Sequence, residues 1–407
     1  MKLVLLTHPS SFVTASMPRF AEMIRRGMVA RGHAVEIWTS QPLLGRLSTG
    51  PGLARKWLGY IDQFLLYPRQ LRKQADQQPE DTLFVFTDQA LGMWVPFVAH
   101  LPHVIHCHDF LALKSARGEY PENSTGWTGA QYQRLILKGF SRGNAFISVS
   151  RKTKDDLTRF LPRQPDISEV VHNGLNHPFR PMPTDERVSR LNVAGLKIPE
   201  PGFLLHVGGN QWYKNREGVL NIYRAYAASQ ARPAALWMAG EPPTEFLRNL
   251  ARSIPSPGHV QFVSGLTNEQ INAAYSHACA LLFPSLDEGF GWPIAEAMAS
   301  ECPVITTNLA PMTEVAGNVA KLIPRMPREG VQQIAWAIAA AAAVDEVVRL
   351  EDRSRKDLLS QGRLNSARFN TETALAAYEE IYFKALKRSS LKSAVPVRQE
   401  AGVAVRL

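Results

Sequence analysis

The sequence predicts an α/β fold built from two doubly wound halves. Short β-rich runs alternate with amphipathic helical stretches along nearly the whole chain, which is typical of βαβ units and parallel sheets. The alternation pauses in a proline-rich, polar stretch near residues 178–200 and then begins again. Since 407 residues are enough for two cores, we expect two domains. Such open sheets bind ligands at the carboxyl ends of their strands, so the cleft between the domains is the expected site.

Each half is expected to contain six strands. The first crossover helix is indicated by Met17, Phe20, Ile24 and Met28 at helical spacing, and Gly32 is expected to cap its end. The expected strands are 3–7, 35–39, 83–86, 103–105, 145–149 and 169–172, followed by 203–207, 234–239, 260–262, 280–283, 304–306 and 320–323.

The composition excludes several classes of protein. With 45% hydrophobic and 20% charged residues, the chain is unlike collagen-like, low-complexity or disordered sequences. The longest unbroken apolar run, 334–344, is too short to span a bilayer, and residues 3–7 are interpreted as a strand and not as a signal sequence. Cys107, Cys279 and Cys302 have no CxxC spacing, which argues against disulfides or structural zinc and favours the cytoplasm.

The net charge of +10 lies mostly in residues 1–200, which indicates an anionic partner for that half. The basic residues are dispersed and no recognition motif for nucleic acid is present, so a nucleic-acid binder is disfavoured. Residues 53–73 mix basic and aromatic side chains. This segment fits either an anionic membrane surface or a helix packed on its own sheet.

The most informative segment is 283–299. An expected strand leads into a loop with Gly289 and Gly291, and Pro293 opens the following helix. The free backbone N–H groups of Phe290 and Gly291 at this helix start suit an anionic phosphate. The segment therefore predicts a phosphate cradle between a buried strand and a helix.

Two glutamates flank this cradle. Glu288 and Glu296 have seven residues between them, and a carboxylate accepts two hydrogen bonds from a vicinal diol. A phosphate cradle with two diol acceptors describes a nucleotide sugar. The segment resembles the EX7E motif of retaining GT-B glycosyltransferases, in the form found in glycosyltransferase family 4. The resemblance implies that Glu296 holds the ribose and that Glu288 faces the donor sugar.

The loop at 206–215 resembles another element of family 4. Lys214 corresponds to the lysine that clamps the leaving diphosphate, where a positive charge is needed, and Gly209 lies in the same donor-binding loop. The family commonly has an arginine shortly before this lysine, but Gly209 and Asn210 stand there. Arg216 is a candidate substitute, so the second positive charge stays unassigned.

In the first half, residues 105–110 resemble the His-Asp element of family 4 at a strand end. The resemblance places His108 near the donor hexose and the reaction centre, with Asp109 as its orienting partner. The alternative is that His106 and His108 are ordinary strand-end histidines. No third ligand of suitable spacing supports a zinc site at this pair, so no metal is expected.

The resemblance extends over most of the chain and implies its organisation. Gly265 lies in a stretch that resembles the loop beside the nucleotide base. The amino-terminal loop at 8–16 departs from the family because it has no glycine, so acceptor choice is not carried over. The expected parts are an acceptor-side domain at 1–180, a linker at 181–200, a nucleotide-sugar-binding domain at 201–370, a helix crossing back at 371–388 and a frayed tail at 389–407.

The resemblance implies a retaining, metal-independent hexosyltransferase. It would move a hexose such as mannose or glucose from a nucleoside diphosphate sugar, most simply a GDP- or UDP-sugar, to a saccharide or lipid-linked acceptor in envelope or exopolysaccharide synthesis. No further cofactor is expected, and the location is cytoplasmic, with peripheral contact at the inner membrane face as an option. The linkage and the oligomeric state are left open.

Three other functions are compatible with the scaffold. A sugar-nucleotide epimerase or a phosphorylase would process its ligand without an added sugar acceptor. A non-catalytic scaffold would bind nucleotide without transfer. A nicotinamide dehydrogenase is disfavoured because neither opening strand is followed by G-x-G-x-x-G.

Overall fold

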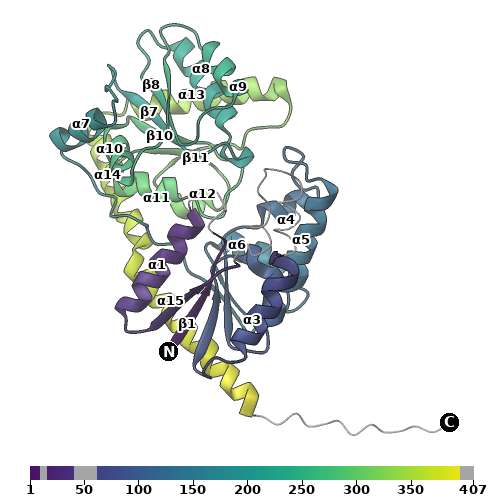
Figure 1. The fold of residues 1–407 in the computed structure, drawn as a ribbon. Coiled ribbons are helices and arrows are strands. Elements are labelled where there is room, and N and C mark those ends of the chain that lie inside the picture. Colours follow the sequence, from purple (N-terminus) through teal and green to yellow (C-terminus); the bar gives the residue numbers. More distant parts are fainter. Residues whose placement is uncertain (10–15, 41–61, 395–407) are drawn as a thin grey trace, which may run out of the picture.

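The computed structural model describes residues 1–9, 16–40 and 62–394. It contains two α/β domains, each with one six-stranded parallel sheet (Figure 1). The strand order is β2-β1-β3-β4-β5-β6 in the first sheet and β12-β11-β10-β7-β8-β9 in the second. Helices cover both faces of the sheets, which explains why strands such as β1, β3 and β10 are continuous apolar runs with no alternation.

The first domain is formed by the described elements from β1 to β6. Its strands are β1 (Lys2–Leu6), β2 (Ala34–Trp38), β3 (Thr82–Phe86), β4 (His103–Cys107), β5 (Ala145–Ser148) and β6 (Ile167–Val170). Its helices are α1 (Ser16–Ala30), η2 (Asp62–Leu66), α3 (Tyr67–Ala75), η3 (Gln89–Phe97), α4 (Leu111–Ala116), α5 (Trp127–Phe140) and α6 (Arg151–Phe160), of which η2 continues directly into α3.

The second domain, which the sequence predicts to bind the donor and which is named the donor domain after that prediction, follows the same plan. Its strands are β7 (Phe203–Val207), β8 (Ala235–Ala239), β9 (Val260–Val263), β10 (Ala280–Phe283), β11 (Val304–Thr307) and β12 (Lys321–Ile323). Its helices are α7 (Thr184–Val193), η4 (Trp212–Lys214), α8 (Arg216–Ser229), α9 (Glu245–Arg252), α10 (Asn268–His277), α11 (Trp292–Ala299), α12 (Met312–Ala316), α13 (Gly330–Val348), α14 (Asp352–Ser366) and η5 (Ala367–Phe369).

The predicted fold class is confirmed, and each predicted strand corresponds to an observed one. The largest shift is at β6, which begins at Ile167 and not at 169. The predicted helix cap at Gly32 is also found, with φ at +82° and a hydrogen bond from its N–H to the Val29 carbonyl. The stretch 181–200 contains α7, whose Leu191 is buried in the donor-domain core.

Helix α15 (Thr371–Ala394) joins the two domains. It leaves the donor domain after η5 and runs down along the first domain, where it lies beside α1 (Figure 1). Leu375, Tyr378 and Tyr382 are buried among the first-domain residues that cover one face of its sheet. The helix continues through 389–394, and the rest of the predicted tail, 395–407, lies outside the described residues.

Among the described helices, α13 alone is long and apolar enough to cross a membrane, with a mean hydropathy of 1.3 over its most apolar window. It packs against α8, and its residues Trp336, Ala340 and Val344 are buried in the donor-domain core. Such a face is what a core helix of an α/β domain presents.

Each sheet has a switch point, where the strand order changes direction. In the first domain it lies between β1 and β3, and in the donor domain between β7 and β10. At a switch point, the loops after two adjacent strands run in opposite directions. A crevice therefore forms at the carboxyl ends of these strands, where open α/β sheets bind ligands. The loops that follow β7 and β10 carry the predicted donor residues Lys214 and Glu288.

Candidate functional site

The structure brings Lys214 and Glu288 into direct contact, although they are 74 residues apart. The Lys214 ammonium donates to Glu288 Oε1 at 2.7 Å, and the Ser285 hydroxyl donates to the same oxygen at 2.9 Å. Glu288 is buried, and burial raises the pKa of its carboxyl even though Lys214 opposes the shift. The structure therefore places the Lys214 ammonium and the Glu288 carboxyl together at the switch point of the donor-domain sheet.

Two loops position this pair. Asn215 has φ at +52° and caps α8 by accepting from the Gly218 N–H at 3.1 Å. Its amide also donates to the Pro284 carbonyl at 2.8 Å, which ties the loop after β7 to the loop after β10. The contacts of Asn215 thus fix the backbone position of its neighbour Lys214.

The segment predicted to be a phosphate cradle lies at the start of α11. Gly291 has φ at +98°, a conformation that glycine adopts without strain, and it stands immediately before Trp292 and Pro293. The Phe290 ring is buried and packs edge-on against Phe369, with ring centroids 5.3 Å apart. The side chain of Phe290 is therefore part of the donor-domain core.

Glu296 lies in α11 beyond this cradle. The Tyr275 hydroxyl donates to its Oε2 at 2.9 Å, and burial raises the pKa of Glu296 to about 7. Arg19, in the first turn of α1, is close enough to lower that pKa in part. The hydrogen bond to Oε2 thus orients the Glu296 carboxyl, and among the described residues no hydrogen bond is found at its other oxygen.

This raised pKa predicts a pH dependence of stability. The folded-state pKa lies above the ordinary value of 4.5, so the contribution of Glu296 is complete below that value and is lost as the pH rises through about 7. We expect the free energy of unfolding of the wild type to fall between about pH 5 and pH 8 by about 1–3 kcal/mol more than that of Glu296→Gln. Urea unfolding at both pH values measures this, and equal losses in the two proteins would contradict it.

The predicted residue of the first domain, His108, follows β4 and lies in the same cleft. Its Nε2 donates to the Thr87 carbonyl at 2.9 Å, which leaves Nδ1 with the lone pair. Burial lowers the pKa of His108, although Asp88 opposes the shift. A neutral imidazole in this tautomer accepts a hydrogen bond from a hydroxyl at Nδ1.

Asp109 does not orient His108 as the sequence suggested. Its Oδ1 accepts from the Leu111 N–H at 3.0 Å, and burial raises its pKa to about 6. The carboxylate that acts on the His108 ring belongs to Asp88, which also pairs with His8 at 2.9 Å. Asp88 and His8 follow β3 and β1, so they stand at the switch point of the first sheet. A carboxylate just after an apolar strand was the signal that could have identified Asp88.

Arg216, the candidate for the second positive charge, has two buried guanidinium nitrogens, Nε and Nη2, without a hydrogen-bond partner in the described part of the chain. Its guanidinium is buried and donates from Nη1 to Asn210 Oδ1 at 2.5 Å and to the Glu241 carbonyl at 2.9 Å. Burial lowers the pKa of Arg216. The two contacts of Nη1 hold the loop that contains Gly209, and a role of Arg216 at the diphosphate stays a prediction.

The glycines at the donor side differ in their surroundings. Gly265 has φ at +76°, and a Cβ there would meet nothing within 4 Å. A Cβ at Gly209 would lie 2.6 Å from Gln211 Oε1 and 2.8 Å from Glu241 Oε1. A Cβ at Gly289 would lie 1.9 Å from the backbone oxygen of His108, in the other domain. Gly289 thus allows the backbones of the two domains to touch.

Two family models match this chain. The model described as Glycosyltransferase Family 4 matches residues 17–178, and the model described as Glycosyl transferases group 1 matches residues 191–356. Together they account for most of the chain. The chain belongs to the family 4 glycosyltransferases of GT-B fold.

Relatives of this family 4 chain include two mannosyltransferases. The O-antigen chain mannosyltransferase RfbU of Salmonella typhimurium is 44% identical over 193 residues, which are 46% of this chain and 49% of that protein. The O-antigen chain mannosyltransferase B of Escherichia coli is 29% identical over 119 residues, which are 29% of this chain and 31% of that protein. The chain therefore spans about half the length of the first relative and about a third of the second.

Solved GT-B structures share the fold along the whole family 4 chain. Sucrose-phosphate synthase from Thermosynechococcus elongatus aligns with a TM-score of 0.71 at 17% identity, covering 95% of this chain and 100% of that one. WaaG, a glycosyltransferase involved in lipopolysaccharide biosynthesis, aligns with a TM-score of 0.65 at 16% identity, covering 97% and 100%. At these identities the likeness establishes the fold.

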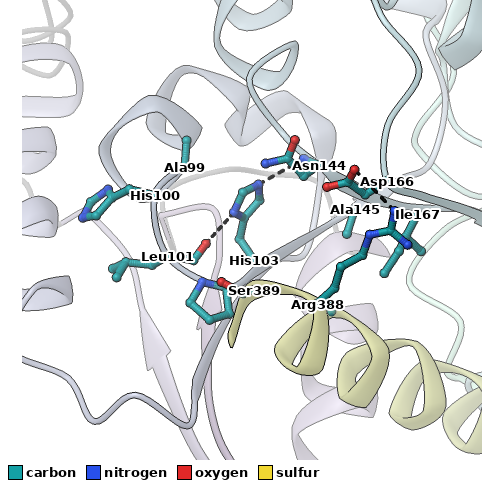
Figure 2. Close-up of a pocket in the computed structure, with 12 residues that line it drawn as sticks. Ala99, His100, Leu101, His103, Asn144, Ala145, Asp166, Ile167, Arg388 and Ser389 are labelled. Carbon is teal, nitrogen blue, oxygen red and sulfur yellow. Dashed lines mark hydrogen bonds and ion pairs between the residues drawn. The ribbon is translucent and has the colours of Figure 1, made fainter. Parts of the chain in front are cut away.

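A cavity at the opposite end of the first sheet's strands is separate from this site. It lies at the amino ends of β4, β5 and β6, beside the end of α15 (Figure 2). His103 is fixed there between the Leu101 carbonyl at 2.8 Å and the Asn144 N–H at 3.2 Å, and Asp166 pairs with Arg388 at 3.7 Å (Figure 2). These polar groups are engaged with each other, and no predicted site residue lines the cavity.

Within residues 1–9, 16–40 and 62–394, no group of three or more histidine, cysteine, aspartate or glutamate side chains is arranged to hold a metal ion. His106, which with His108 forms the pair of histidines at the end of β4, is buried. Its Nε2 lies 2.8 Å from the Tyr382 hydroxyl. His106 therefore joins α15 to the first sheet.

Proposed function

We propose that this chain is a retaining hexosyltransferase that uses a nucleoside diphosphate sugar as donor. The observation that carries the proposal is the cluster of Lys214, Glu288 and the start of α11 at the switch point of the donor domain. A lysine beside free N–H groups suits a departing diphosphate, and a buried carboxylate suits the hydroxyls of the donor hexose.

The proposed reaction needs no protein nucleophile. The bond between the anomeric carbon and the phosphate oxygen breaks, and its electron pair leaves with the diphosphate towards Lys214. The acceptor hydroxyl forms the new bond on the same face of the sugar, and its proton passes to the leaving phosphate oxygen. Configuration is therefore retained. We propose that protein groups, without a metal, neutralise the leaving charge, with Glu296 holding the ribose and neutral His108 accepting from a donor hydroxyl.

The proposed donor sugar is mannose or glucose. Two relatives are named O-antigen chain mannosyltransferases, and a structural neighbour was solved with UDP and glucose. We therefore place GDP-mannose and UDP-glucose first among donors, and a saccharide or lipid-linked acceptor of envelope or exopolysaccharide synthesis first among acceptors. No other cofactor enters the proposal.

A donor panel tests this function. The purified protein is incubated with GDP-mannose, UDP-glucose and their ADP and dTDP counterparts, with and without saccharide and polyprenyl-linked acceptors, and released nucleoside diphosphate is measured. One donor is expected to be consumed faster when an acceptor is added. Consumption that ignores acceptors would favour an epimerase or phosphorylase, and binding of nucleotide without turnover would favour a scaffold.

We also propose a cytoplasmic location with peripheral contact to an anionic membrane. Part of the basic segment 53–73 lies outside the described residues, but η2, α3 and α5 carry an exposed mixture of cationic and apolar side chains. Such a surface suits an anionic bilayer. Sedimentation with anionic but not zwitterionic vesicles checks the proposal, and equal recovery with both would contradict it. The exposed residues are Leu65, Arg69, Arg72, Lys73, Trp127, Arg134, Leu135 and Lys138.

A further inference from the structure

A network of charged and phenolic side chains crosses the cleft beside the loop after β10, which carries Glu288. Asp287, next to Glu288, is surrounded by three side chains of the first domain. Lys152 approaches its Oδ1 at 2.6 Å, Lys114 approaches its Oδ2 at 3.7 Å, and the Tyr120 hydroxyl donates to Oδ2. Each of these contacts joins the two domains.

This network also reaches the backbone of Glu288. Asp287 Oδ1, which accepts from Lys152, accepts as well from the Glu288 N–H at 2.7 Å. The same Lys152 ammonium donates to the Glu288 carbonyl at 3.3 Å. Both backbone polar atoms of Glu288 are therefore held by groups whose geometry depends on the other domain.

The neighbouring residues are engaged across the cleft too. The Ser150 hydroxyl donates to the Gly289 carbonyl at 2.8 Å. Arg325 donates to the Leu286 carbonyl at 3.2 Å and pairs with Glu122 of the first domain at 2.9 Å. Residues 286–289 thus make a continuous set of contacts to the first domain, directly or through Arg325.

We propose that Asp287 is a positioning residue, which couples closure of the two domains to the placement of Glu288. The proposal rests on the proposed function and concerns the same site. The first-domain partners Lys152, Lys114 and Tyr120 orient the loop only when the cleft is closed. Lys214, Glu296 and the start of α11, which we propose to bind the nucleoside diphosphate part of the donor, all belong to the donor domain.

The charge balance of the network suits a contact that forms and breaks in each cycle. Lys152 and Lys114 also face Asp156, at 3.3 Å and 3.5 Å, so two ammonium groups meet two carboxylates. Their side chains are 10–14% exposed in the closed structure. Burying a paired charge costs desolvation that its partner offsets, so the closed state gains defined geometry with little net free energy. Removing one member leaves its partners unpaired in the closed state only.

The main test compares wild type with Asp287→Asn, Lys152→Gln and the double variant. The amide introduced by Asp287→Asn keeps an oxygen for the Glu288 N–H but loses the charge that Lys152 meets, so the fold of the donor domain is preserved. The matched control is Lys154→Gln, which removes a charge from the same helix α6 at a residue outside the network.

Closure is measured without catalysis by small-angle scattering in excess GDP or UDP. We expect a larger radius of gyration for both single variants than for the wild type and Lys154→Gln. With an active donor, we expect kcat to fall about tenfold or more, KM for the donor to change less than about threefold, and a larger share of donor to be lost to water. Lys152→Arg should recover part of kcat, and the double variant should lose no more than the worse single variant.

Unchanged scattering together with kcat within about twofold of wild type in Asp287→Asn would overturn the proposal, as would fully additive losses in the double variant. Should the wild type transfer no sugar, the proposed function fails while the scattering comparison still decides whether Asp287 governs closure.

Discussion

Lys214→Met is expected to lower kcat by about 100- to 1000-fold, the range found when one group that stabilises developing negative charge is removed. The methionine side chain keeps the length of the stem and loses the ammonium that lies 2.7 Å from Glu288. A radiometric or coupled assay of nucleoside diphosphate release measures the effect. Lys356→Met, on the exposed side of α14, is the control and should retain wild-type kcat.

The same variant separates a catalytic from a structural role. Without Lys214, the buried Glu288 carboxylate has lost its counter-charge, so the single variant should also be less stable. Lys214→Met/Glu288→Gln removes both charges and should recover most of that stability while staying inactive. Near wild-type turnover in either protein would show that this pair is not part of the reaction.

Gly289→Ala is expected to lower kcat by about 100-fold, since a displacement of about 1 Å at a reacting centre has effects of that size. The new Cβ would lie 1.9 Å from the His108 backbone oxygen and 3.0 Å from Asp109 Cβ. Because the nearest of these atoms belongs to the backbone, no side chain can move aside, and the domains must separate to relieve the clash.

Because this clash is between domains, each domain should still fold. Thermal unfolding of Gly289→Ala should differ little from wild type, and scattering with excess nucleotide should show a more open molecule. Gly330→Ala, where a Cβ meets nothing within 4 Å, is the matched control. Wild-type kcat in Gly289→Ala would mean that the closed arrangement described here is not the reacting one.

The fold was accessible from the sequence because parallel strands covered on both faces are continuous apolar runs, as at β1, β3 and β10. Glu288 and Glu296 could be predicted because a local loop-to-helix pattern carries them. Lys214 could be predicted because the loop at 206–215 resembles an element of family 4. What the sequence predicts for these residues' roles stays a prediction, although their placement in one cleft is a feature of the structure.

The sequence predicted the first-domain residues of the site only in part. Adjacency in sequence suggested Asp109 as the partner of His108, but the carboxylate that acts on this ring is Asp88, which follows another strand. The contact of Lys152 with Asp287 joins residues 135 positions apart. No local pattern encodes such a contact, because it depends on how two finished domains meet.

The central claim, retaining transfer from a nucleoside diphosphate hexose, is tested most directly by the anomeric configuration of the first product. With the donor identified in the panel, NMR of the purified first product reports the one-bond coupling between C1 and H1 of the transferred sugar, which distinguishes an α from a β linkage for both mannose and glucose. We expect an α-linked donor to give an α-linked product, and we expect Lys214→Met to form this product about 100- to 1000-fold more slowly. A β-linked product would contradict the proposed same-face mechanism and the roles assigned to Lys214 and Glu288.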